Sequence, residues 1–171
     1  MTSNEEKAGY QNRYEQWLAD SGRPLKIQNS PELFCDGVYT HLNGITVSIR
    51  QLNDTSDRII MVANLNIPPA LQEAFSNLPD SDKAALSLDT TLGLLQLGVQ
   101  FSFPVKDNVL QAVTVERTVF GESMTKQIFF DNLYRIIDAL IVVQLRFQQR
   151  LGLALHKTSV GEGGANTSFY G

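Results

Sequence analysis

The stretch that decides the fold is LFCDGVYTHLNGITVSIRQL, residues 33–52, in which two strand-like runs flank an Asn-Gly pair. In GITVSIRQL, apolar and polar side chains alternate, so Ile45, Val47 and Ile49 share one face. Asn43 and Gly44 both tolerate the positive backbone angles of a tight primed turn, which is a strong hairpin signal. The sequence therefore predicts an antiparallel hairpin that is buried on one face.

Three further strands extend this hairpin. RIIMVANLNI (58–67) is apolar nearly throughout, which indicates a central strand covered on both faces. VQFSFPVK (99–106) and VLQAVTVERTV (109–119) flank a turn at Asp107 and Asn108 and predict a second hairpin. Pro104 marks an edge or a bulge, because proline cannot donate to a ladder. Five strands are expected in all.

The N-terminal segment predicts a helix. Thr2 and Ser3 are followed three residues later by Glu5 and Glu6, the spacing at which a capping side chain and a returning carboxylate satisfy free amides at a helix start. Gly22 and Pro24 end the pattern. One face carries three aromatic residues and a leucine: Tyr10, Tyr14, Trp17 and Leu18. Such a stripe is typical of core packing, and the alternative is the wall of a ligand pocket.

Further helices complete the order of elements. A short helical turn is expected at ALQEAFSNL (70–78). The next helix is expected to be capped by Asp80 or Ser81, and it is predicted by the repeat of Ala85, Leu88, Leu92 and Leu95. The last helix runs from about Glu122 to Leu151. The order α-β-β-β-α-β-β-α predicts an α+β fold, with an antiparallel five-stranded sheet, helices on one face and part of the other face available. Residues 1–153 form one domain, and the Gly-, Ser- and Thr-rich remainder, 154–171, is a flexible tail.

Composition excludes several classes of function. The chain has 171 residues, 43% of them hydrophobic, and a net charge of −4 with its 14 basic residues dispersed, which argues against nucleic acid as a partner. A single cysteine, Cys35, excludes an intrachain disulfide and a four-cysteine zinc site, so we expect a reducing, cytoplasmic location. The N-terminus lacks the apolar segment of a secretory signal.

No catalytic or metal-binding motif is present. Cys35 and His41 lie on one predicted strand, about 20 Å apart when extended, so they cannot form a dyad. NDTSD (53–57) lacks the later glycine and the glutamate of a calcium loop, and GEGG (161–164) follows no strand. We expect neither an enzyme, nor a cofactor, nor a metal site.

The apolar helix FFDNLYRIIDALIVVQLRFQQR (129–150) is the best clue to function. Its longest uncharged run, from Ala139 to Leu145, is far shorter than the ~20 residues that span a membrane. Its apolar arc of roughly 200° is about twice the width needed for docking on a sheet. Either neighbouring helices cover the excess, or part of it is an interface, most simply that of a symmetric dimer. The candidate interface residues are Ile137, Leu140, Ile141, Val143 and Phe147, with Phe101 and Phe103 on the second hairpin.

The order of elements resembles that of the small acidic secretion chaperones of type III export systems and of YbjN-type regulators. YEQWLADSG (14–22), DRIIMVANLNI (57–67) and ESMTKQIFFDNLYRI (122–136) look like segments of an uncharacterised, largely archaeal family thought to share that fold. The resemblance implies a dimeric, cytoplasmic, non-enzymatic protein that holds an extended peptide. In the chaperones, the second helix region and adjacent strands usually form the dimer.

Two hypotheses on function follow. The first is a protein- or peptide-binding module, a homodimer that acts without a cofactor and recognises a client by strand-edge pairing and apolar pockets. The alternative is a small-molecule-sensing regulatory domain, in which Tyr10, Tyr14 and Trp17 cover a pocket between the first helix and the sheet.

Overall fold

The computed structural model describes residues 3–28, 30–54, 57–106 and 109–151, and the predicted tail at 154–171 lies outside them. Its helices are α1 (Asn4–Asp20), α2 (Pro69–Ser76), α3 (Asp80–Gln96) and α4 (Lys126–Leu151). Its strands are β1 (Lys26–Gln28), β2 (Leu33–Thr40), β3 (Thr46–Leu52), β4 (Arg58–Asn66), β5 (Gln100–Ser102), β6 (Val105–Lys106), β7 (Val109–Leu110) and β8 (Ala112–Phe120). The α+β class is confirmed.

The hairpin at residues 33–52 forms as predicted. β2 and β3 pair antiparallel, and Gly44 adopts a positive φ of 84° in the turn that joins them. The amide of Gly44 donates to the carbonyl of His41 at 2.9 Å, and the side-chain oxygen of Asn43 accepts from the amide of Ile45 at 3.1 Å. The turn thus fixes the register that places Val47 and Ile49 in the core.

Six strands, not five, form the main antiparallel sheet, in the order β1-β2-β3-β4-β8-β5. The sequence missed β1 because its three residues are all exposed and show no alternation. The second predicted hairpin divides at Pro104, whose carbonyl accepts from the amide of Gln111 at 2.8 Å. Its outer parts, β5 and β8, join the main sheet, whereas β6 and β7 form a separate two-stranded sheet. The turn predicted at 107–108 lies outside the described residues.

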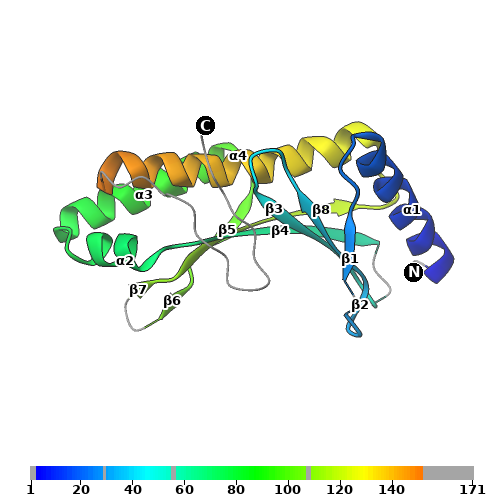
Figure 1. Ribbon diagram of the computed structural model, residues 1–171, viewed down its shortest axis with the longest axis horizontal. Coiled ribbons are helices and arrows are strands. Elements are labelled where there is room, and N and C mark those ends of the chain that lie inside the picture. Colours follow the sequence, from blue (N-terminus) through cyan, green and yellow to red (C-terminus); the bar gives the residue numbers. More distant parts are fainter. Residues whose placement is uncertain (1–2, 29, 55–56, 107–108, 152–171) are drawn as a thin grey trace.

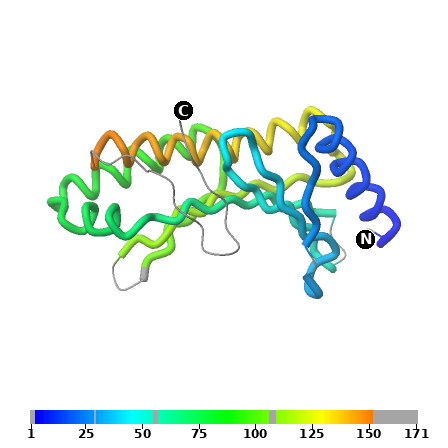
Figure 2. The backbone as a smooth tube through the Cα atoms, in the orientation of Figure 1, coloured from blue at the N-terminus to red at the C-terminus, as the bar shows by residue number. Residues whose placement is uncertain are grey.

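The helices gather on one face of the sheet (Figure 1). α4 runs along the sheet, with α1 at one end and α2 and α3 at the other, as the chain trace shows (Figure 2). Alternate side chains of the central strands, such as Ile49, Met61 and Val115, are buried beneath them. The other face of the sheet carries half-buried or exposed side chains.

α1 is attached to the sheet by a buried lysine. Ser3 and Glu6 form the predicted capping box at the start of the helix. One turn later, the Nζ of Lys7 donates to the carbonyl of Leu52 at 2.7 Å and to that of Asp54. Because Lys7 is 1% exposed, these bonds replace its contacts with water. The lysine therefore ties α1 to the end of β3.

We expect Lys7→Met to lower the free energy of unfolding by about 1–3 kcal/mol, because the two carbonyls lose a charged donor. Urea unfolding followed by circular dichroism measures this change. Lys83→Met is the matched control: Lys83 pairs with Asp80 at 3.5 Å at the surface, so its loss should change stability by less than about 0.5 kcal/mol. Equal effects of the two substitutions would contradict the anchoring role of Lys7.

Candidate functional site

Most of the apolar arc of α4 is covered within the chain, and Leu145 is the large exposed side chain of that arc. Four of the seven predicted interface residues are buried in the core: Ile137, Leu140, Val143 and Phe147. Phe129 stacks on Tyr14 of α1 with ring centres 5.7 Å apart, and Phe147 stacks on Phe75 of α2 at 6.4 Å. The assignment of these four residues to an external interface is therefore corrected. Neighbouring helices and the sheet cover this part of the arc, so a partner cannot reach these four side chains without opening the fold.

The other three predicted residues lie partly at the surface. Ile141, Phe101 and Phe103 are half-buried and pack against the core. The rings of Phe101 and Phe103 are 5.5 Å apart. Phe103 and the buried Phe147 come together in a pocket, although the sequence places them on different elements.

This cavity, the apolar pocket, has a volume of about 160 Å³. Its walls come from α2, α3, α4 and the β6-β7 hairpin, with the residues Phe75, Leu86, Ser87, Thr90, Phe103, Val105, Leu110 and Phe147. The hydroxyl of Thr90 donates to the carbonyl of Leu86 at 2.7 Å, so it is used within its own helix. Leu86, Leu110 and Phe147 are buried, whereas Ser87 and Val105 are exposed. The apolar pocket therefore has an apolar floor and an open rim.

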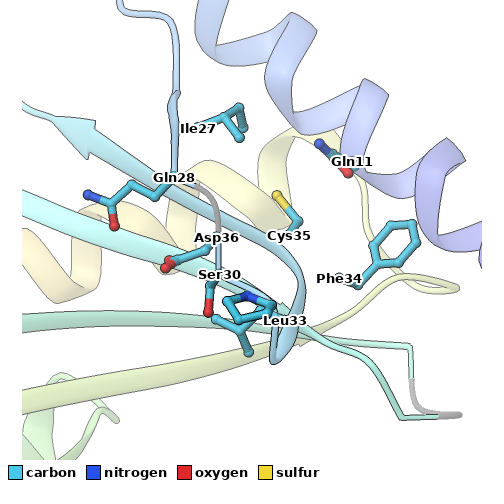
Figure 3. Close-up of a pocket in the computed structure, with 9 residues that line it drawn as sticks. Gln11, Ile27, Gln28, Ser30, Leu33, Phe34, Cys35 and Asp36 are labelled. Carbon is cyan, nitrogen blue, oxygen red and sulfur yellow. The ribbon is translucent and has the colours of Figure 1, made fainter.

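A second cavity, the edge pocket, lies between α1, β1 and β2 and has a volume of about 320 Å³. Figure 3 shows Gln11 on α1 above Cys35 on β2, on facing elements. Ser30 and Asp36 add further polar groups to its lining. This volume falls at the lower end of the range for small-molecule sites.

The edge pocket lies between α1 and the sheet, but the three residues of the alternative hypothesis, Tyr10, Tyr14 and Trp17, do not line it. Tyr14 is fully buried against Phe129, and Trp17 packs beside the same ring at 5.8 Å. Tyr10 lies over Gly121, where an added Cβ would come within 2.3 Å of the ring. The aromatic face of α1 is thus a packing surface, and small-molecule sensing in the edge pocket stays a prediction.

The surroundings of Cys35, which is buried and free, disfavour its thiolate form. Burial raises the pKa of Cys35, the neighbouring Tyr14 hydroxyl offsets part of this effect, and the charges of Glu15 and Asp36 add to it. Burial likewise raises the pKa of the Tyr14 hydroxyl, with a further contribution from Cys35. Both shifts favour the neutral form of the Cys35 thiol and of the Tyr14 hydroxyl.

Two polar side chains on the core face of the sheet were missed by sequence reasoning. Gln51 is fully buried, and its amide has no hydrogen-bond partner among the described residues. Arg117 donates to Asn132 of α4 and to the carbonyl of Gly98 beyond the end of α3. The alternation of side chains along a strand could have identified both residues. Gln51 lies on the same face of its strand as the buried Val47, and Arg117 lies on the same face as the buried Val115.

Neither a metal cluster nor a membrane-spanning helix is found in the described part of the chain. Residues 3–28, 30–54, 57–106 and 109–151 contain no group of three or more His, Cys, Asp or Glu side chains arranged to hold a metal ion. No helix within these ranges is long and apolar enough to cross a membrane.

Residues 11–147 match the model of a family described as an uncharacterized conserved protein, DUF2299. The chain belongs to this family. The predicted resemblance to an uncharacterised family is thereby confirmed. The match covers most of this chain. No curated protein matches the sequence.

Two solved structures resemble this DUF2299 protein. An uncharacterized protein from Methanothermobacter thermautotrophicus has a TM-score of 0.77 at 19% identity, over 84% of this chain and 99% of its own. YbjN, a putative transcription regulator from E. coli, has a TM-score of 0.45 at 16% identity, over 81% of this chain and 92% of its own. The archaeal match shows a shared fold.

The state of Cys35 is tested by its reaction with a thiol reagent such as DTNB at pH 8. We expect the native protein to react at least about tenfold more slowly than the urea-unfolded chain, because only the unfolded thiol has its ordinary pKa. The raised pKa also means that stability falls as the pH rises above the unfolded thiol pKa, since the unfolded chain then loses a proton that the folded chain keeps. Equal native and unfolded rates would contradict this account.

Proposed function

We propose that this protein is a non-enzymatic binding module for extended protein segments, in which one apolar side chain of the bound segment enters the apolar pocket. The observation that carries the proposal is the position of this pocket beside an outer strand of the sheet. β5 is the outermost strand on that side, and the next residue, Phe103, lines the pocket. Backbone pairing at a strand edge combined with a side-chain pocket is the arrangement used for extended peptides.

The size and chemistry of the apolar pocket suit one leucine or phenylalanine side chain. Its volume of about 160 Å³ is close to that of an engineered apolar cavity that takes up benzene, roughly 150 Å³. The aromatic rings of Phe75 and Phe147 form one wall. With the hydroxyl of Thr90 already bonded, an apolar group would enter without leaving a buried donor unpaired.

The edge strand β5 has fewer residues that discourage strand addition than β1, the edge strand on the opposite side of the sheet. Charged side chains and prolines usually discourage the addition of a strand to a sheet edge. β5, with the sequence QFS, contains neither, whereas β1, with the sequence KIQ, has Lys26 at its start. Pro104 follows β5 by two residues, so an added segment would end its pairing near the apolar pocket.

Selection from a displayed library of random peptides, followed by fluorescence anisotropy on synthetic peptides, tests the proposal. We expect enriched peptides to share one large apolar residue. Ser87→Leu should weaken their binding at least about tenfold, because a leucine at the exposed rim occupies the entrance to the pocket.

Asn12→Leu is the control, since it adds the same side chain at an exposed position on α1, away from the residues that line the pocket. It should leave binding unchanged. The proposal fails if no peptide is enriched above the bare support, or if Ser87→Leu binds as tightly as the wild type.

A further inference from the structure

The outward face of α3 carries three exposed leucines. Leu88, Leu92 and Leu95 are 58%, 49% and 59% exposed, although their repeat is the pattern that predicted this helix. Each residue of an α-helix is rotated by about 100° from the one before it. On this basis the three leucines and several smaller side chains lie within a sector of roughly 100° on the helix surface. This face, the α3 stripe, comprises Ser81, Ala84, Ala85, Leu88, Leu92 and Leu95. The buried residues Leu86 and Leu94 lie on the opposite side of the helix.

α4 covers the inner side of α3 and leaves the α3 stripe uncovered. The two helices approach closely at Gly93, where an added Cβ would lie 2.9 Å from Val142. Beside this contact, Arg150 donates to Asp89 at 3.1 Å. Exposed leucines grouped on one helix face are typical of an interaction surface, because their burial removes apolar area from water.

Side-chain sizes along the α3 stripe fit a second α3 that runs in the opposite direction. The N-terminal half holds serine and alanine, the C-terminal half holds leucine, and Leu88 lies midway. When two such helices cross antiparallel at Leu88, Leu92 of each faces Ala84 of the other, and Leu95 faces Ser81. Large side chains then meet small ones, which allows close packing of the helices.

Charges along α3 fit the same arrangement. Asp80 and Asp82 lie in its first turn. At its other end, Arg117 and Arg135 both donate to the carbonyl of Leu97, and neither has an ion-pair partner among the described residues. Antiparallel pairing brings the acidic start of each α3 towards the arginines of the other copy. It also places the helix dipoles in opposite directions, which is favourable.

We infer that the α3 stripe is covered by a second copy of this chain, in a two-fold dimer whose α3 helices cross antiparallel at Leu88. A two-fold interface brings the same surface of both copies together, so that surface must be complementary to itself in side-chain size and in charge. Binding to a different protein does not require such self-complementarity. One helix pair buries less than a standard interface of about 1,600 Å², so the dissociation constant is expected in the micromolar range. The α3 stripe and the apolar pocket share no residue, so this inference goes beyond the proposed function and can fail independently of it.

Sedimentation equilibrium from about 5 to about 200 µM tests the dimer. We expect the wild type to be dimeric at the upper concentration, and Leu88→Glu to be monomeric with an unchanged circular dichroism spectrum. Leu145→Glu is the matched control, because Leu145 on α4 is 48% exposed but lies outside the α3 stripe, and it should remain dimeric. A monomeric wild type, or a Leu88→Glu protein as dimeric as the wild type, would overturn the inference.

Cysteine cross-linking tests the antiparallel geometry without a disruptive charge. In a Cys35→Ala background, Ala84→Cys and Leu92→Cys proteins are mixed and oxidised with copper phenanthroline in air. We expect the mixed disulfide to form in preference to either self-disulfide, because Ala84 of one copy faces Leu92 of the other. A Leu145→Cys protein mixed with Leu92→Cys should give no mixed product. Preferential self-linkage of Leu92→Cys would indicate parallel helices and overturn the antiparallel arrangement.

Discussion

Burial of the apolar face of α4 is the constraint on which the rest of the structure depends. At one end of the helix, Phe129 lies against Tyr14 and Trp17 of α1. At the other end, Phe147 lies against Phe75 of α2, and between them the helix covers the inner face of the sheet. The elements at the two ends of the molecule thus share one core, since each buries apolar area against the same helix.

Because most of the apolar face of α4 is buried within the chain, the two surfaces that we propose for partners lie beside this helix. Arg117 helps to place one of them: it reaches from β8 to Asn132 of α4 and to the carbonyl of Gly98, and so fixes the end of α3. Gly98 has a positive φ of 65°, which suits glycine at a helix end. α3 is thereby held with its leucine repeat outwards, while its flank at Ser87 borders the apolar pocket.

The parts of the fold that have strong local signals were predicted, and those set by tertiary packing were not. The capping box at Ser3 and the Asn43-Gly44 turn act over a few residues, so both were predicted correctly. β1 carries no local signal, because only its pairing with β2 defines it. The leucine repeat predicted the helix α3 but not which of its faces is turned towards the core, since such a repeat can lie on a buried or on an exposed face. The pockets combine residues from distant elements, and no single segment predicts them.

The central claim is that the chain itself covers α4, whereas a second copy covers α3. Amide hydrogen exchange at a low and a high protein concentration tests it directly, because protection from a partner depends on concentration and protection within the chain does not. We expect exchange across residues 129–147 to be slow and equal at both concentrations, and exchange in α3 to slow at the higher concentration. Concentration-dependent protection of α4, with α3 unchanged, would contradict the account.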